Sequence, residues 1–454
     1  MKMKIIVAGN GKVGTSLARQ LARENHDVTL IDKDMSVLSE SADQFDVMTI
    51  QGNCASVPVL KNAEVKSADL LIAVTGADEV NLLTCMTAHG LNKNIHTIAR
   101  IRNPEYTDQI YNMKDMFALS LTVNPEHQAA VEIERLLRYP GFFNRDTFAK
   151  GRVEIVELRI DQKSKLCNVA LSDIDAIVNC KVLVCAVLRN GEAITPDGNF
   201  VLQPGDRVFV TAPTTQLTKL LNNLGLITKR VNRVILCGGG RVSYYLAKHL
   251  EQSHISVTII ESNYKRCTEL SELLPNASII YGDASNQNML ESEIGSDCDA
   301  LVSATGFDEL NMIISIYGKN REIPQIITKI SRMEHSNMWY DLPIGKVICP
   351  KELCTHSIVR YVRAMQNPVE GAVTMHTIAD GQIEAMEFLV DNQTRNCGKQ
   401  LKDIRLRPNV LLACINHGSK TEIPSGNSTF DVGDTVVVVT NGSNIIHQLN
   451  DIFA

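Results

Sequence analysis

One stretch near the start of the chain constrains the fold more than any other: KIIVAGNGKVGTSLARQLARENHDVTLID, from Lys4 to Asp32. It has the pattern of a short apolar strand, a Gly-x-Gly-x-x-Gly turn, an amphipathic helix and a second strand that ends in an acid. In such a turn the first glycine allows a tight bend, the second lets the backbone approach a pyrophosphate, and the third lets the helix pack closely on the strand. These glycines are Gly9, Gly11 and Gly14. The stretch therefore predicts a mononucleotide or dinucleotide site at the start of the helix.

The acid at the end of the second strand bears on which nucleotide binds. Asp32 lies 18 residues after Gly14 (32 − 14 = 18), where a carboxylate accepts hydrogen bonds from ribose hydroxyls. Because a carboxylate there disfavours a 2′-phosphate, NAD, ATP or ADP fits better than NADP. The alternative is a fold of this type that has lost its ligand.

Apolar runs of strand length alternate with helical stretches as far as Arg138, which predicts a doubly wound parallel sheet. Sheets of this kind bind ligands at the carboxyl ends of their strands. The residues that follow the predicted strands are therefore candidate nucleotide contacts. They are Gly9, Asn10, Gly11, Lys12, Val13, Gly14, Asp32, Lys33, Asn53, Cys54, Thr75, Gly76, Asp78, Asn81 and Arg100.

The chain then repeats this pattern. VNRVILCGGGRVSYYLAKHLEQSHISVTIIES matches the opening stretch, and Gly238 and Glu261 follow Gly9 and Asp32 at an offset of 229 (238 − 9, 261 − 32). TGFDELN repeats TGADEVN at an offset of 230. The second copy therefore predicts a second set of candidate contacts. They are Gly238, Gly239, Gly240, Arg241, Val242, Glu261, Asp283, Ala284, Thr305, Asp308 and Lys329.

The two copies differ at positions that matter for a nucleotide. Ser243 stands at the third glycine position of the second copy, which predicts a more crowded contact between helix and strand. Asp283 stands where the first copy has Asn53. Lys329 replaces Arg100, and a lysine keeps the charge but cannot make a bidentate phosphate contact. We favour the first site, because its glycine fingerprint is complete.

Each copy ends in a segment of different character. After Tyr139-Pro140-Gly141 the chain changes to short strands and turns, with a hairpin signal at Arg189-Asn190-Gly191. The endings PGDRVFV and VGDTVVVV mark the same kind of segment in both copies. The predicted fold is α/β, with two tandem Rossmann-like parallel sheets, each followed by a small α+β lobe. The predicted domains are nucleotide-binding lobes at 1–140 and 230–366 and small lobes at 151–229 and 370–454.

Composition and missing motifs narrow the function. A net charge of −6 argues against a general nucleic-acid binder. The 12 cysteines are scattered without a C-x-x-C pair and many lie in apolar runs, which indicates buried thiols in a reducing cytosol rather than a metal site. No apolar run is long enough to span a bilayer. No G-x-S-x-G, Walker A lysine or H-E-x-x-H motif points to catalysis.

Together, GNGKVG, TGADEVN, IARIRNPEY and the duplicated endings resemble the TrkA family of tandem RCK (regulator of K⁺ conductance) proteins. These are cytosolic regulatory subunits of bacterial Trk/Ktr-type potassium uptake systems. The resemblance implies a protein that is not an enzyme and that lies peripherally on the inner face of the cell membrane. It implies that NAD(H), ATP and ADP bind the chain and gate an integral membrane potassium transporter or channel subunit. Because rings of this kind usually hold eight modules, two modules per chain imply a homotetramer.

Several alternatives stay open at this point. The fingerprint also allows an NAD-dependent oxidoreductase, or a scaffold in which nucleotide only stabilises the fold. Arg100 is either a phosphate or interface contact, or a surface arginine paired with Glu105. The apolar stripes of the helices at 126–138 and 351–363 indicate either core packing or a crossover element or subunit interface.

Overall fold

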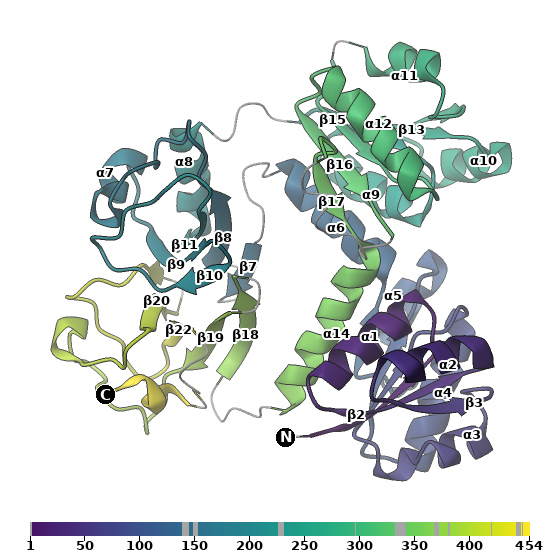
Figure 1. Ribbon diagram of the computed structural model, residues 1–454, viewed down its shortest axis with the longest axis horizontal. Coiled ribbons are helices and arrows are strands. Elements are labelled where there is room, and N and C mark those ends of the chain that lie inside the picture. The colour runs from purple at the N-terminus through teal and green to yellow at the C-terminus, as the bar shows by residue number, and fades with distance from the viewer. Residues whose placement is uncertain are drawn as a thin grey trace. The chain divides into compact units, whose positions relative to one another are not determined.

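The computed structural model describes residues 2–138, 145–148, 153–225, 231–295, 297–331, 342–366, 372–379, 382–418, 420–441, 446 and 448–454. The chain forms two compact units, and each takes one segment from each copy of the repeat (Figure 1). Unit 1 comprises Met1–Arg138 and Val231–Gln366, and unit 2 comprises Tyr139–Arg230 and Asn367–Ala454. The two lobes predicted to bind nucleotides therefore share one unit, and the two small lobes share the other.

The first lobe of unit 1 is a parallel sheet of six strands in the order β3-β2-β1-β4-β5-β6. This is the strand order of dinucleotide-binding folds. Its central strands are buried on both faces, which explains their continuous apolar runs. The elements are β1 Lys4–Ala8, α1 Lys12–Arg23, β2 Asp27–Asp32, α2 Met35–Gln44, β3 Met48–Gln51, α3 Val57–Asn62, β4 Leu70–Ala73, α4 Asp78–Leu91, β5 His96–Arg100, α5 Pro104–Asn112, β6 Leu121–Val123 and α6 Pro125–Arg138.

The second lobe repeats this topology in the order β14-β13-β12-β15-β16-β17, also with parallel strands. The predicted pair of doubly wound parallel sheets is confirmed. The elements are β12 Arg233–Cys237, α9 Arg241–Gln252, β13 Ser256–Glu261, α10 Tyr264–Leu273, β14 Ser278–Tyr281, α11 Gln287–Ile294, β15 Ala300–Ser303, α12 Asp308–Asn320, β16 Gln325–Lys329, β17 Lys346–Ile348 and α14 Pro350–Gln366.

The last helix of each lobe packs on the other lobe (Figure 1). Ile133 and Leu137 of α6 share a core with Leu246 of α9 in the second lobe. Ile358 of α14 shares a core with Leu17 of α1 in the first lobe. The apolar stripes of α6 and α14 therefore belong to a crossover between lobes, in which each helix packs on the other lobe of unit 1.

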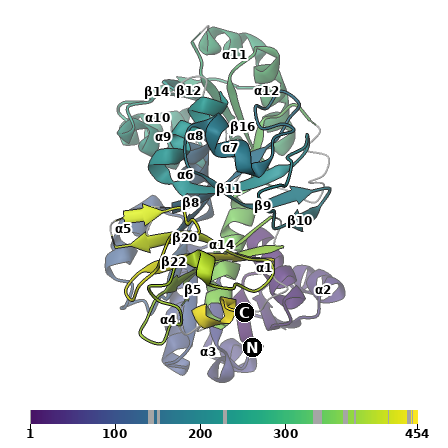
Figure 2. The same ribbon diagram turned by 90° about the vertical axis from the view of Figure 1, so that its left-hand side faces the viewer.

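Unit 2 contains two antiparallel sheets of five strands, in the orders β10-β9-β11-β8-β7 and β18-β19-β22-β20-β21. Figure 2 shows the first sheet in teal and the second in yellow-green, stacked on each other. Phe148, Phe209 and Cys185 of the first meet Ala385, Cys414 and Val437 of the second in one core. The elements are β7 Arg145–Phe148, β8 Val153–Arg159, α7 Ile174–Val178, β9 Leu183–Arg189, β10 Glu192–Ile194, β11 Arg207–Pro213, α8 Thr214–Leu224, β18 Ala372–Ile378, β19 Ile383–Leu389, β20 Val410–His417, β21 Lys420–Glu422 and β22 Thr435–Thr440.

Three further predictions concern the hairpin turn, the start of the first small lobe and the burial of the cysteines. Asn190 and Gly191 have φ angles of 53° and 82°, so the predicted hairpin turn joins β9 and β10. β7 pairs with β8 and precedes the predicted start of the small lobe at residue 151. The domain boundaries themselves remain predictions. Ten of the twelve cysteines are buried, as predicted.

Candidate functional site

The first fingerprint owes its shape to two close backbone contacts. Gly9 has a φ of 103°, and a Cβ there would lie 2.9 Å from the Cα and N of Thr75. A Cβ on Gly14 would lie 1.9 Å from the carbonyl oxygen of Gly9. A Cβ on Gly11 would meet no atom within 4 Å. Gly9 and Gly14 are therefore required by packing, whereas Gly11 leaves open space at the start of α1.

The helix that follows the fingerprint begins with free backbone donors. Gly11 is the N-cap of α1, no side chain caps it, and no acid lies in its first turn. Lys12 is exposed and Val13 is buried. Uncapped N–H groups and the helix dipole make this end of α1 suited to an anion such as phosphate.

Asp32 lies at the end of β2, beside the fingerprint. Its carboxylate accepts hydrogen bonds from the backbone N–H groups of Asn10 at 2.6 Å and Asp34 at 3.0 Å. The Asn10 side chain is buried and donates to the Val37 carbonyl at 2.7 Å and the Ser41 hydroxyl at 2.8 Å. The acid therefore braces the fingerprint loop and lies where a ribose would follow the phosphates.

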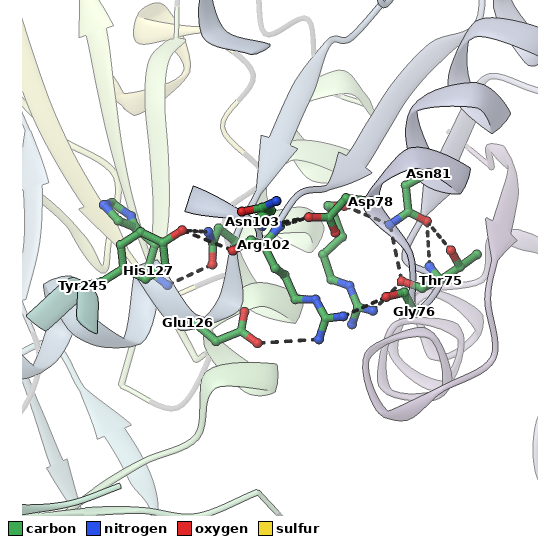
Figure 3. Close-up of polar contacts among 11 residues, drawn as sticks. Thr75, Gly76, Asp78, Asn81, Arg102, Asn103, Glu126, His127 and Tyr245 are labelled. Carbon is green, nitrogen blue, oxygen red and sulfur yellow. Dashed lines mark hydrogen bonds and ion pairs between the residues drawn. The ribbon is translucent and has the colours of Figure 1, made fainter. Parts of the chain in front are cut away.

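Asn81 joins the loop after β4 to the end of β5. Its Oδ1 accepts from the N–H and the hydroxyl of Thr75 at 2.8 and 2.7 Å, and its Nδ2 donates to the Arg100 carbonyl at 2.8 Å. The side chain is fully buried. Asn81, a predicted ligand contact, is a brace that fixes Thr75 at the sheet edge (Figure 3).

Two arginines, one at the end of β5 and one just after it, hold the same loop. The Arg100 guanidinium donates to the Thr75 carbonyl, and that of Arg102 donates to the Gly76 carbonyl at 2.8 Å. Burial lowers the pKa of Arg100, and the neighbouring charge of Arg102 adds to this. The pairing of Arg100 with Glu105 that the sequence left open is not among its contacts with the described residues.

Asp78 completes this edge of the first sheet. One of its carboxylate oxygens accepts from the N–H groups of Arg102 and Asn103, both at 2.8 Å (Figure 3). The other oxygen, Oδ1, is buried without a hydrogen-bond partner among the described residues. Asp78 thus ties the start of α4 to the segment after β5.

The second copy reproduces this geometry. Gly238 has a φ of 101°, and a Cβ there would lie 2.9 Å from Thr305. Glu261 accepts from the N–H of Gly239 at 2.6 Å, as Asp32 does from Asn10. Gly240 is the N-cap of α9, again without a side-chain cap, with Arg241 exposed and Val242 buried behind it.

The far edge of the second site is held by a lysine instead of arginines. Lys329 donates to the Thr305 carbonyl at 2.6 Å, and burial lowers its pKa. Asp308 accepts from the Ser331 N–H at 2.9 Å, in the role of Asp78. Asp283 is exposed and accepts from the Ser285 N–H at 2.8 Å, a bond that lowers its pKa.

The fingerprint loops of the two copies are packed differently, and each difference involves a pair of residues. Asn10 and Ser41 are hydrogen-bonded in the first copy, and at the equivalent positions Gly239 makes room for Leu270. At Ser243, where the sequence predicted a crowded contact, the buried hydroxyl donates to the Gly238 carbonyl.

Most predicted residues lie at these two edges. Asn53 is exposed and turns its side chain to the Ala55 N–H at 3.2 Å, and Lys33 is exposed. Cys54 and Ala284 are buried behind the loops, and burial raises the pKa of the Cys54 thiol. Arg102 was missed, although it stands in IARIRNPEY two residues after Arg100, a spacing that places both side chains on one face of an extended segment.

The fold and the two matching edges define a class of protein with two Rossmann-type nucleotide folds and two small α+β lobes in one chain. TrkA-N domains match residues 5–119 and 234–350, and TrkA-C domains match residues 155–225 and 385–454. The chain therefore belongs to the TrkA family.

Individual relatives agree over the full length. A Trk system potassium uptake protein TrkA homolog of Archaeoglobus fulgidus is 34% identical over 99% of this chain and 100% of its own length. The Trk system potassium uptake protein TrkA of Haemophilus influenzae is 29% identical over 99% of this chain and 98% of its own. A solved GsuK channel bound to NAD superposes with a TM-score of 0.65 at 16% identity, covering 97% of this chain and 77% of that chain. This last likeness shows the fold.

Proposed function

We propose that the chain is a nucleotide-sensing regulatory subunit of a potassium uptake system. The observation that supports this proposal is that the same arrangement occurs at the carboxyl edge of both parallel sheets. In both copies an acid bonds the fingerprint N–H at 2.6 Å beside an uncapped helix N-terminus. Asp32 and Glu261 would hold ribose hydroxyls, and the starts of α1 and α9 would hold phosphates. The other predicted contacts surround these groups.

The ligands we propose are NAD(H), ATP and ADP. Solved GsuK structures bound to NAD and to ADP share this fold, and the carboxylates at Asp32 and Glu261 disfavour a 2′-phosphate. Arg100 and Lys329 supply a partly buried positive charge at the first and second edges. Each would contact the phosphate or nicotinamide end of the ligand. No catalytic step is part of the proposal, so a hydride-transfer assay should give no turnover.

Calorimetric titration tests the two sites directly. Wild-type protein should bind ADP, ATP or NADH in two classes of site with Kd values in the low micromolar range. Asp32→Ala should weaken nucleotide binding at the first class of site by at least about tenfold, because a hydrogen bond to a carboxylate is lost. Glu261→Ala should weaken binding at the second class in the same way.

A matched control separates this effect from the loss of a charge. Asp43 is an exposed acid on α2 of the same lobe and makes no hydrogen bond to the fingerprint among the described residues. Asp43→Ala should leave both classes unchanged. If Asp32→Ala and Asp43→Ala behave alike, Asp32 does not hold the ligand, and if wild-type protein binds no nucleotide, the chain does not sense these compounds.

The proposed partner is an integral membrane potassium transporter or channel subunit, with the chain bound peripherally on the cytoplasmic face. Among the helices that the structure describes, none combines the length and apolar character needed to span a bilayer. A nucleotide would gate flux by binding one ring conformation more tightly than another. A hundredfold preference corresponds to about 2.8 kcal/mol.

We propose that chains assemble into a homotetramer through α4 and α12. Leu83 and Ile313 occupy equivalent positions on these helices (313 − 83 = 230) and are 53% and 63% exposed. Beside Leu83, an apolar groove of about 360 Å³ opens between α4 and α5, lined by Met86 and Met113 among others. Exposed apolar surface of this kind marks contacts with other chains.

Light scattering tests this assembly. The wild-type mass should equal four chains, and Leu83→Asp combined with Ile313→Asp should give a smaller species, because a buried charge opposes association. Glu40→Asp, an exposed change on α2, serves as the control and should leave the mass unchanged. A wild-type monomer would contradict the proposed ring.

A further inference from the structure

A tyrosine of the second copy reaches the edge of the first site. Tyr245 lies on α9, in the second lobe, and its ring is buried. Its hydroxyl donates to the Arg102 carbonyl at 3.2 Å and accepts from the Asn124 side chain at 3.0 Å (Figure 3). His127 packs edge-on against its ring, with centroids 5.1 Å apart. The contact joins residues 143 positions apart in the chain.

Arg102 is the residue through which this contact bears on the first site. Its N–H and that of Asn103 donate to Asp78, while its guanidinium donates to the Gly76 carbonyl and lies 3.7 Å from the Glu126 carboxylate. These contacts fix both ends of the loop that runs from Thr75 into α4. The Tyr245 hydroxyl holds the backbone of the one residue that makes most of these contacts.

The reciprocal crossover does not carry this link. Aligning the copies places Ser16 at the position of Tyr245, Ser331 at that of Arg102 and Cys349 at that of Asn124. Ser16 carries its hydroxyl directly on Cβ and makes no hydrogen bond to Ser331 or Cys349 within the described ranges. The packing of α14 on α1 is chiefly apolar in this region. Among the described residues, the second site therefore lacks a hydrogen bond equivalent to the one that Tyr245 gives to Arg102.

We propose that Tyr245 is a positioning residue that the second copy supplies to the first nucleotide site. It holds Arg102 so that the loop Thr75–Asp78 keeps the shape that a nucleotide requires. This inference rests on the proposed nucleotide site at the first edge. Its consequence is that the first site is complete only when α9 of the second lobe is in place.

Two conservative variants test the role of this hydroxyl. Tyr245→Phe removes the hydroxyl and keeps the ring. Tyr244→Phe is the matched control, since its ring is also buried and contacts Tyr245, but its hydroxyl makes no hydrogen bond to the described residues. Each is titrated with ADP in a Glu261→Ala background, which reports the first site, and in an Asp32→Ala background, which reports the second.

Tyr245→Phe should weaken ADP binding at the first site by about three- to tenfold, the effect of one neutral hydrogen bond, and change the second by less than about twofold. Tyr244→Phe should change neither. Equal weakening of both sites, or an unchanged first site, would overturn the inference while leaving the proposed function standing. Absence of ADP binding in wild-type protein would overturn the proposed function and, with it, the role given to Tyr245.

Hydrogen exchange in the ligand-free protein gives a second, independent measurement. In Tyr245→Phe, the amides of Arg102 and Asn103 should exchange faster, because their bonds to Asp78 depend on the anchored backbone. The amides of β1 should exchange as in wild type, which would show that the lobe remains folded. Unchanged exchange at Arg102 and Asn103 would overturn the inference even if nucleotide binding changed.

Discussion

Gly14→Val is expected to prevent the first nucleotide lobe from folding normally. A Cβ at this position would lie 1.9 Å from the Gly9 carbonyl oxygen and 3.0 Å from its carbon. These are backbone atoms of the fingerprint turn, so relief requires α1 to move away from β1 and opens the core around Leu17. Overpacking alone costs about 1–3 kcal/mol, and a clash with backbone lies at or beyond the upper end of this range. The melting transition of unit 1 and ADP binding at the first site should both be lost or strongly reduced.

Gly14→Ser is the matched control for this prediction. The second copy already carries Ser243 at the equivalent position, and its hydroxyl donates to the Gly238 carbonyl. A serine brings the same Cβ toward the Gly9 carbonyl, but it is smaller than valine and its hydroxyl can donate to that carbonyl. Gly14→Ser should therefore be destabilising but tolerated better than Gly14→Val. If Gly14→Val melts at the wild-type temperature and binds ADP normally, the close approach of α1 to the fingerprint does not exist in solution.

Arg189→Ala is expected to destabilise unit 2 by about 3 kcal/mol or more, because it leaves a buried carboxylate without its cation. Asp206 is 1% exposed and accepts two bonds from the Arg189 guanidinium, both at 2.8 Å, and one from the Gln203 N–H at 2.7 Å. Arg189 also covers the Phe200 ring, with its guanidinium carbon 4.6 Å from the ring centroid. Chemical denaturation of the wild-type and variant chains measures the loss.

The control for Arg189→Ala comes from the other small lobe. There His417 contacts Asp434 at 2.7 Å, in the positions of Arg189 and Asp206. Arg189→His should therefore cost less than Arg189→Ala. Equal stability of Arg189→Ala and wild type would show that the pair contributes nothing to the fold.

The stability difference between the wild-type chain and Arg189→Ala depends on pH through the ionisation of Asp206. Burial raises the pKa of its carboxyl, but the bonds from Arg189 and Gln203 outweigh burial, and the pKa lies below its usual value. A depressed pKa means that the ionised pair stabilises the fold above the unfolded pKa of about 3.9, and that this stability is lost as pH falls through the folded pKa. The difference in the free energy of unfolding between the wild-type chain and Arg189→Ala should thus be constant near neutral pH and become smaller in acid. A difference that grows as pH falls would contradict this assignment.

The sequence was sufficient to predict the fold class and the geometry of both fingerprints, because both depend on neighbours in the chain. Gly9 and Gly14 are five residues apart, and the strand that ends at Asp32 pairs directly with the strand before Gly9. The residue types and their spacing therefore determine the turn, the close helix and the acid beside it. The same local rules predicted the hairpin at Asn190-Gly191.

Contacts between distant segments were not predictable in the same way. The apolar stripes of α6 and α14 showed that these helices are buried, but a stripe does not identify the surface that covers it. The exchange of helices between lobes follows from packing of the whole unit. Likewise, no local pattern joins Tyr245 to Arg102, so the brace between the copies became visible only in three dimensions.

The most direct test of nucleotide regulation by these two sites is potassium flux through the reconstituted membrane partner, measured with the wild-type chain and with the Asp32→Ala, Glu261→Ala double variant. We expect that adding ADP, ATP or NADH changes the potassium flux when the wild-type chain is bound and leaves it unchanged with the double variant. Flux that ignores all three nucleotides with the wild-type chain, or that responds equally with the double variant, would contradict the claim that these two sites regulate potassium uptake.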